Sequence, residues 1–136
     1  MSDVDLEATQ RVHELMPYTR LLGVEVIRFD ADEVRARVAW APERCTSNGL
    51  LHGGVLMGLA DAMGGMVAFA NLPADAAGTT TVNSATNFLR GVSSGHLNGV
   101  GRALHKGRTT VVVDTELFDD AGRLVGRVTQ TQLVLR

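Results

Sequence analysis

The sequence predicts an α+β fold in which a curved antiparallel sheet wraps around one long apolar helix. Residues 55–70 are apolar apart from Asp61 and fall short of the roughly 20 residues that a membrane span needs. Alternating segments joined by short turns lie on both sides of this run, and short turns favour antiparallel neighbours. A single apolar helix between such segments is best buried by a sheet that curves around it.

The elements follow from periodicity and from turn residues. An N-terminal helix is expected from Ser2, which forms a Ser-x-x-Asp capping pattern with Asp5, and Pro17 ends it or opens a second turn. The central helix is expected from about Gly53 to Asn71. The expected strands cover residues 24–29, 33–40, 79–89, 97–105, 109–119 and 124–135.

Alternation is clearest in the second strand. Val34 and Ala36 share one face, whereas Arg35 and Arg37 share the other, which we expect to face solvent.

Composition is that of one globular domain over residues 1–136, with 45% hydrophobic and 21% charged residues. The net charge of −2 gives no general attraction to nucleic acid or to an anionic membrane. Cys45 is the single cysteine, so no internal disulfide forms, and no zinc-ligand spacing is present. The first residues lack a signal-peptide pattern. We therefore expect a cytoplasmic protein without a metal or other cofactor.

The start of the central helix is suited to binding an anion or a polarised carbonyl. The sequence there is His52-Gly53-Gly54, and the first N–H groups of a helix have no intrahelical partner. Glycines let a ligand approach the backbone closely. A carbonyl oxygen at the Gly53 N–H would be polarised, and a developing oxyanion would be stabilised. Packing glycines and a capping histidine are the simpler alternatives.

Asp61 is the second candidate for chemistry. A carboxylate in apolar surroundings costs several kcal/mol unless it is paired, solvated or protonated. It can act as a nucleophile or as a base for water, or it can simply be paired with a buried arginine or a backbone group. Asp61 follows Gly53 by eight residues, which is roughly 12 Å along a helix. If both act on one carbonyl, two antiparallel helices must meet at a homodimer interface.

The element from His52 to Asp61, HGG-x6-D, resembles the signature of hotdog-fold acyl-CoA thioesterases, in particular the PaaI-type branch of the hydroxybenzoyl-CoA thioesterase superfamily. The preceding segment 47–51, the strand over residues 79–90 and the tail from residue 106 are also similar to that family. The similarity covers nearly the whole chain, and HGG-x6-D is its specific part.

The resemblance implies a six-stranded hotdog sheet, homodimers that usually pair into tetramers, and hydrolysis of acyl-CoA thioesters without a metal. By similarity, Asp61 attacks the carbonyl or activates water, and the Gly53 N–H polarises the carbonyl. His52 orients the site or the leaving thiol, and Thr81 on the next strand positions the water or the acid.

The resemblance also suggests residues that bind substrate. Many relatives have an asparagine six residues before the histidine, where Thr46 stands here. Asn48 can take that polar role or shape a turn, and Gly54 allows close approach of a ligand. Three basic residues are candidates for the coenzyme A phosphates, although each can equally be a solvated charge: Arg90, Lys106 and Arg108.

The sequence is also compatible with two other functions. A non-catalytic acyl-CoA binding or regulatory module would use Gly53 and the basic turns without Asp61. A hotdog hydratase or dehydratase would need a histidine placed with the acid, and the helix carries none four residues from Asp61. Neither the acyl group nor the choice between coenzyme A and an acyl carrier protein can be read from the chain.

Overall fold

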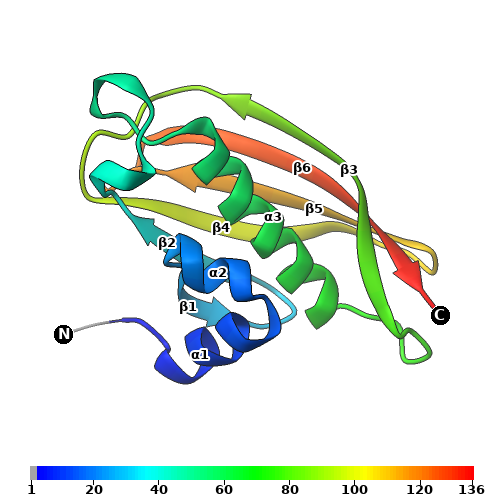
Figure 1. The fold of residues 1–136 in the computed structure, drawn as a ribbon. Coiled ribbons are helices and arrows are strands. Elements are labelled where there is room, and N and C mark those ends of the chain that lie inside the picture. Colours follow the sequence, from blue (N-terminus) through cyan, green and yellow to red (C-terminus); the bar gives the residue numbers. More distant parts are fainter. Residues whose placement is uncertain (1–2) are drawn as a thin grey trace.

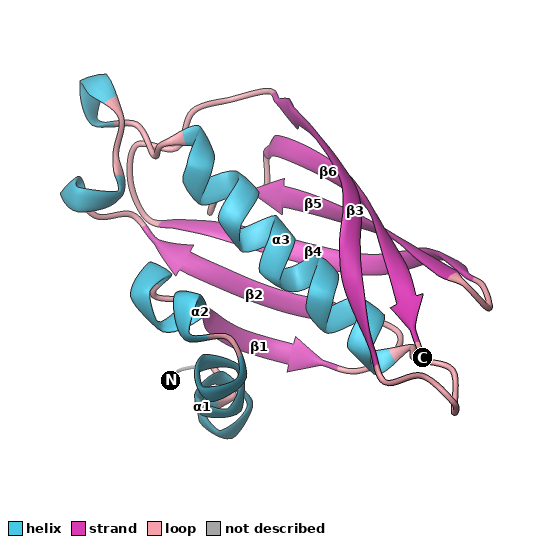
Figure 2. Ribbon diagram, turned by 45° about the vertical axis from the view of Figure 1, so that its right-hand side comes forward, coloured by secondary structure: helices cyan, strands magenta, loops and turns pink. Residues whose placement is uncertain are grey.

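A computed structural model describes residues 3–136, which form three helices and six strands (Figures 1 and 2). The helices are α1 (Leu6–Leu15), α2 (Pro17–Leu22) and α3 (Gly53–Ala70), with 3₁₀ turns at Pro42–Arg44 and Ser47–Gly49. The strands are β1 (Glu25–Phe29), β2 (Val34–Ala39), β3 (Gly78–Phe88), β4 (His96–Lys106), β5 (Thr110–Phe118) and β6 (Leu124–Leu135).

The strands form one antiparallel sheet in the order β1-β2-β4-β5-β6-β3. The sheet curves around α3, and α1 and α2 lie beside β1 (Figure 1). This is the hotdog fold, so the predicted fold class is confirmed.

The predicted element boundaries agree closely with the structure, except at the N-terminus. The central helix ends at Ala70, where the Asn71 N–H donates to the Ala68 carbonyl at 3.1 Å and the Leu72 N–H donates to the Phe69 carbonyl at 3.4 Å. α1 begins at Leu6 rather than at Ser2, because the Asp5 side chain is the N-cap and accepts a 2.9 Å hydrogen bond from the Ala8 N–H. Ser2 itself lies outside the described residues.

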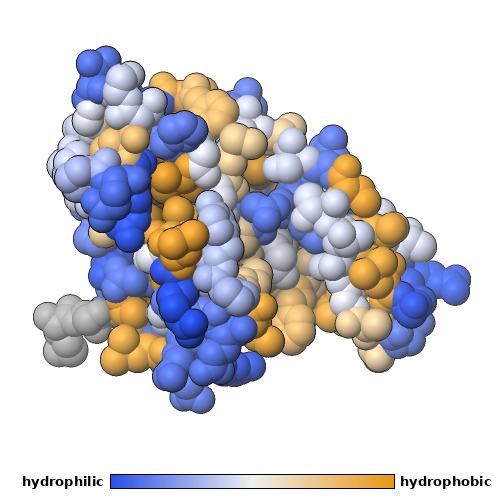
Figure 3. Space-filling model, viewed as in Figure 1, coloured by the Kyte–Doolittle hydropathy of each residue, from blue (hydrophilic) through white to orange (hydrophobic). Residues whose placement is uncertain are grey.

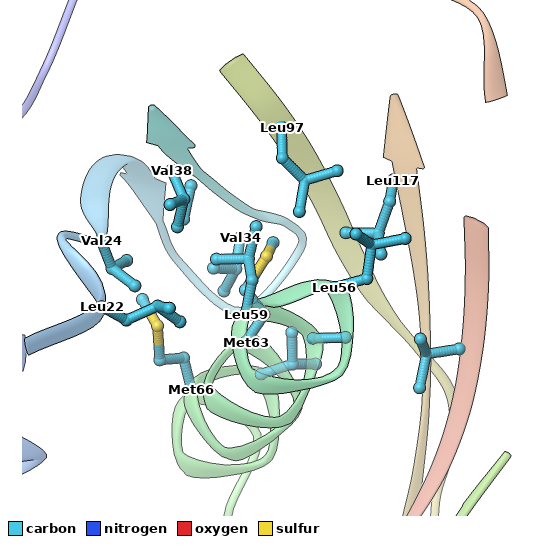
Figure 4. Close-up of a cluster of buried hydrophobic side chains, with 14 of the residues drawn as sticks. Leu22, Val24, Val34, Val38, Leu56, Leu59, Met63, Met66, Leu97 and Leu117 are labelled. Carbon is cyan, nitrogen blue, oxygen red and sulfur yellow. The ribbon is translucent and has the colours of Figure 1, made fainter. Parts of the chain in front are cut away.

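The core lies between α3 and the concave face of the sheet (Figure 4). Leu59, Met63 and Met66 of α3 are fully buried there and meet side chains such as Leu97 and Leu117 from the sheet. By length and composition alone α3 could cross a membrane, but more than half of it is buried inside the fold. It has the burial of a core helix.

The second strand shows the predicted alternation, with an addition. Val34 and Ala36 are buried, whereas Arg35 is half exposed and forms an ion pair with Glu33. The hydrogen bond from Arg35, together with one from Arg102, holds the pKa of Glu33 below its usual value.

The two edges of the sheet differ. At the β1 edge, the N–H of Val26 donates to the Thr9 hydroxyl at 2.8 Å and its carbonyl accepts from the Asp5 N–H at 2.8 Å. At the opposite edge, β3 pairs only with β6, and within residues 3–136 no hydrogen bond covers its outer side. A bulge at Val82 interrupts this edge, and every residue of β3 is at least partly exposed.

Candidate active site

The start of α3 is organised by His52, which is its N-cap. The His52 Nδ1 accepts a 2.8 Å hydrogen bond from the Gly54 N–H, and its carbonyl accepts one of 2.9 Å from the Val55 N–H. The proton of a neutral ring is therefore on Nε2. The structure therefore shows His52 in the capping role, and its role in orienting the site or the leaving thiol stays a prediction.

Gly53 contributes a backbone N–H that is free to donate to a ligand. No acceptor within residues 3–136 is bonded to its N–H, so one positive group remains at the helix start. The residue lines a cleft of about 370 Å³, and a Cβ there would lie 3.1 Å from the Phe88 ring. The cleft has a largely apolar lining that includes Leu50, Leu51, Leu56, Phe88, Leu89 and Val92.

His52 faces a different space. Together with Tyr18 and Arg44 it lines a second cleft, which lies between α2 and the loop before α3. The two clefts flank the helix start, so the Gly53 donor and the His52 ring serve different sides of it.

Asp61 is exposed in the single chain, which corrects the expectation of a buried carboxylate. The reason is geometrical, because Met57, Asp61 and Phe69 follow one another at helical spacing along a stripe of α3 that the chain leaves open. Gly65 belongs to the same stripe, and a Cβ there would meet nothing within 4 Å. Within residues 3–136 no ion pair joins the carboxylate to an arginine, and its Oδ1 accepts a 2.7 Å hydrogen bond from the Gln130 Nε2.

Thr81 is exposed on β3, and it is connected to Asp61 through two glutamines. Its Oγ1 accepts a 2.6 Å hydrogen bond from the Gln132 Nε2, which also donates to the Gln130 Oε1 at 2.9 Å. The structure thus links Asp61 and Thr81, which the sequence analysis predicted as site residues on separate grounds. Sequence reasoning missed both glutamines, although their spacing in β6 carried a signal, because they occupy positions that alternation assigns to the core.

The remaining substrate-binding candidates are dispersed. Asn48 adopts a left-handed conformation with φ 65° and shapes the turn before α3, as its simpler interpretation predicts. Gly54 is exposed beside His52. Thr46, which stands where many relatives have an asparagine, lines the apolar cleft at Gly53.

The three basic residues do not come together in one chain. Arg90 lines the cleft at Gly53, and its N–H bonds to Val125 at the start of β6. Lys106 and Arg108 flank the β4–β5 turn, which bonds through Thr109 to Val134 near the end of β6. Val125 and Val134 are nine residues apart in β6, so Arg90 and the β4–β5 turn lie roughly 30 Å from each other.

Among residues 3–136, no group of three or more His, Cys, Asp or Glu side chains is arranged as a metal site. The polar groups that the site offers are the Gly53 backbone N–H, the Asp61 carboxylate, the Thr81 hydroxyl and the amides of Gln130 and Gln132.

Comparison with known proteins places this geometry in context. The profile of the thioesterase superfamily matches residues 48–126, which include the helix start, Asp61, Thr81 and the Arg90 region. A "Putative esterase" of Mycobacterium tuberculosis is 32% identical over 114 residues, covering 82% of this chain and 81% of that protein.

Two solved structures are also similar. A mutant thioesterase of Pseudomonas aeruginosa has a TM-score of 0.87 at 30% identity, covering 96% of this chain and 94% of that one. A hypothetical thioesterase of Streptococcus pneumoniae, solved with coenzyme A, has a TM-score of 0.79 at 25% identity, covering 93% and 95%.

Proposed function

Because the chain belongs to the thioesterase superfamily and is a thioester hydrolase, we propose that it cleaves acyl-CoA thioesters to a free acid and coenzyme A. The coenzyme in the similar Streptococcus pneumoniae structure supports this choice of thiol. The observation that carries the proposal is the Gly53 N–H, which has no acceptor within residues 3–136 and borders an apolar cleft.

In this proposal the acyl group occupies the cleft at Gly53. The apolar lining favours small, medium or aryl acyl groups, with the Phe88 ring against the acyl chain. The thioester carbonyl oxygen accepts from the Gly53 N–H, where the helix dipole stabilises the oxyanion of the tetrahedral intermediate. The intermediate then expels coenzyme A as a thiolate, which takes up a proton.

Asp61 supplies the attack on the carbonyl carbon. It either removes a proton from the attacking water or attacks directly, forming an anhydride that water then hydrolyses. Single turnover in isotopically heavy water distinguishes the two routes, because only direct attack places the heavy oxygen in Asp61.

The site needs two chains, because Asp61 stands roughly 12 Å along α3 from Gly53. Two observations support a homodimer through the open side of the molecule. β3 is a long edge strand whose outer side carries no hydrogen bond within residues 3–136; it exposes Val82 and Phe88, followed by exposed Leu89, and such edges are ready to pair with another strand. The stripe of α3 that carries Asp61 also exposes Met57 and Phe69, and hydrophobic groups interrupt the polar surface on this side (Figure 3).

A two-fold axis at this interface would place the partner's Asp61 near Gly53. It would also bring the ends of the two sheets together, so that the partner's Lys106 and Arg108 join Arg90 at the coenzyme phosphates. Such dimers would assemble further as a homotetramer.

The test is thiol release from a panel of aryl, short and long acyl-CoA substrates, with Asp61→Asn measured beside the wild type. We expect turnover of at least one class and a loss of about 100-fold or more in kcat for Asp61→Asn. Asp32→Asn, an exposed acid in the β1–β2 turn, is the matched control and should keep full rate. Binding of acyl-CoA without turnover by the wild type would instead favour a regulatory module.

A further inference from the structure

Two glutamines stand where β6 should present apolar side chains to the core. Gln130 is 1% exposed and Gln132 is 2% exposed, and both lie on the face of β6 that also carries Val128 and Val134. Buried amides are costly unless they are hydrogen-bonded, so a core strand with two of them in succession needs an explanation.

Helix α3 leaves a gap for these amides. A Cβ added at Gly64 would overlap the Gln130 Oε1, so no other residue at position 64 would admit the amide as it stands. A glycine in the middle of a helix costs about 1 kcal/mol relative to alanine. Gly64 carries this cost at the point where the Gln130 side chain lies against the helix and bonds to Asp61.

The two hydrogen bonds that join Gln132 to Gln130 and Gln130 to Asp61, which we call the relay, have the same donor-to-acceptor direction. Gln132 donates to Gln130, and Gln130 then donates to Asp61, which as a carboxylate can only accept. Gln132 also donates to the Thr81 Oγ1, so the hydroxyl proton of Thr81 remains available for another acceptor. Each amide is oriented by its neighbours, because reversing Gln130 would place its oxygen against the carboxylate.

We propose that Gln130 and Gln132 are positioning residues, which reach through the gap at Gly64 to fix the Asp61 carboxylate and the Thr81 hydroxyl relative to each other. The inference rests on the proposed catalytic role of Asp61. Neither glutamine touches substrate. Gln130 holds Asp61 Oδ1 so that the other carboxylate oxygen faces the open side of α3, and Gln132 holds Gln130 in the donating orientation.

The first test is Gln130→Met, which keeps the length of the side chain and removes both polar groups. We expect kcat to fall about tenfold or more, the loss typical of a hydrogen bond to a charged group. KM should stay within about twofold, because the relay does not contact substrate. Thr131→Val, on the outward face of the same strand, is the control and should leave both constants unchanged.

A merely structural role predicts a different pattern, in which kcat follows the loss of folded dimer. Melting temperature and sedimentation are therefore measured on each variant, and kcat is expressed per folded dimer. In Gln130→Glu, two carboxyl groups would share a proton at the position of a 2.7 Å hydrogen bond. The singly protonated pair keeps a donor toward Asp61 and the doubly ionised pair loses it, so we expect activity to fall on a basic limb that the wild type lacks, which a loss of packing would not cause.

Two further variants keep the proposal falsifiable if Gln130→Met fails to fold. Gly64→Ala favours the helix but displaces the amide, so it should lower kcat without lowering the stability of α3. Gln132→Met should lower kcat in the wild type but have no further effect in a Gly64→Ala background, or in a Gln130→Met background where that variant folds, because the link between Thr81 and Asp61 is already broken there.

The outcomes separate this proposal from the one on which it rests. If Asp61→Asn retains full rate, the proposed function fails. If Asp61→Asn is inactive while Gln130→Met and Gly64→Ala keep wild-type kcat and pH dependence, the relay is overturned and the role of Asp61 stands. Additive effects of the Gln130 and Gln132 substitutions would also overturn it.

Discussion

The two edge strands of the sheet differ in how their outer backbone groups are covered. β1 is five residues long, and α1 covers its outer side with the Thr9 hydroxyl and the Asp5 N–H bonded to Val26. β3 is eleven residues long, is bulged at Val82 and has no such cover within residues 3–136. The candidate catalytic groups Asp61 and Thr81 lie only on the side of the uncovered edge.

If the site is shared between two chains, as we propose, the difference predicts that the sheet ends at β1 and pairs with a partner at β3. Exposed strands are usually blunted by charges, prolines or a covering element, as α1 covers β1. β3 has no lysine, arginine or proline along its eleven residues and instead exposes Val82 and Phe88. An uncovered edge strand beside the free Gly53 N–H and the exposed Asp61 carboxylate is suited to an active site formed by two chains.

The largest effect is expected when two inactive chains are mixed. Gly53→Pro removes the free N–H, and it suits the helix because proline is favoured at the first helical position and His52 already has an extended backbone with ψ 140°. Asp61→Asn removes the acid. After subunit exchange, the mixture should rise from near zero to about one quarter of wild-type activity, because each heterodimer rebuilds one site of two.

Gly53→Ala is the control for this experiment, since it meets the Phe88 ring as proline does but keeps the N–H. It should retain far more activity than Gly53→Pro. If chains that have demonstrably exchanged stay inactive, the acid and the N–H do not belong to a site shared between subunits, and the contrast between the edges loses its functional meaning.

A smaller effect should follow from placing the same charge at the bulge of each edge. Val82→Lys at the β3 bulge would bury a charge in the proposed interface, so the dimer dissociation constant should rise about tenfold or more, with activity falling in step at low protein concentration. Ile27→Lys at the β1 bulge is the matched variant and should leave assembly and turnover unchanged. Sedimentation equilibrium measures the first quantity. Equal behaviour of the two variants would show that β3 is not the dimer edge.

The contrast also shows how far the sequence could lead. Strands and the central helix follow from period and turn residues, and the HGG-x6-D element located the helix start correctly. The exposure of Asp61 could not be foreseen, because the apolar run around it says how much of α3 is buried but not which stripe stays open. The link from Thr81 to Asp61 passes through two glutamines of β6, and Gln130 is 69 residues from Asp61 in the sequence. Only the register of β3 with β6 brings these residues together.

The smallest effect is expected at the covered edge. Thr9→Val keeps the shape of the side chain but leaves the Val26 N–H without its 2.8 Å acceptor, at a cost of about 1–2 kcal/mol in the free energy of unfolding. Thr9→Ser, which keeps the hydroxyl, should be close to wild type. Denaturant unfolding at one fixed protein concentration measures the difference, since dimer stability depends on concentration. Turnover per folded dimer and the dimer constant should not change, because α1 only closes the sheet at this edge. A loss of turnover in Thr9→Val without loss of stability would mean that the covered edge takes part in catalysis after all.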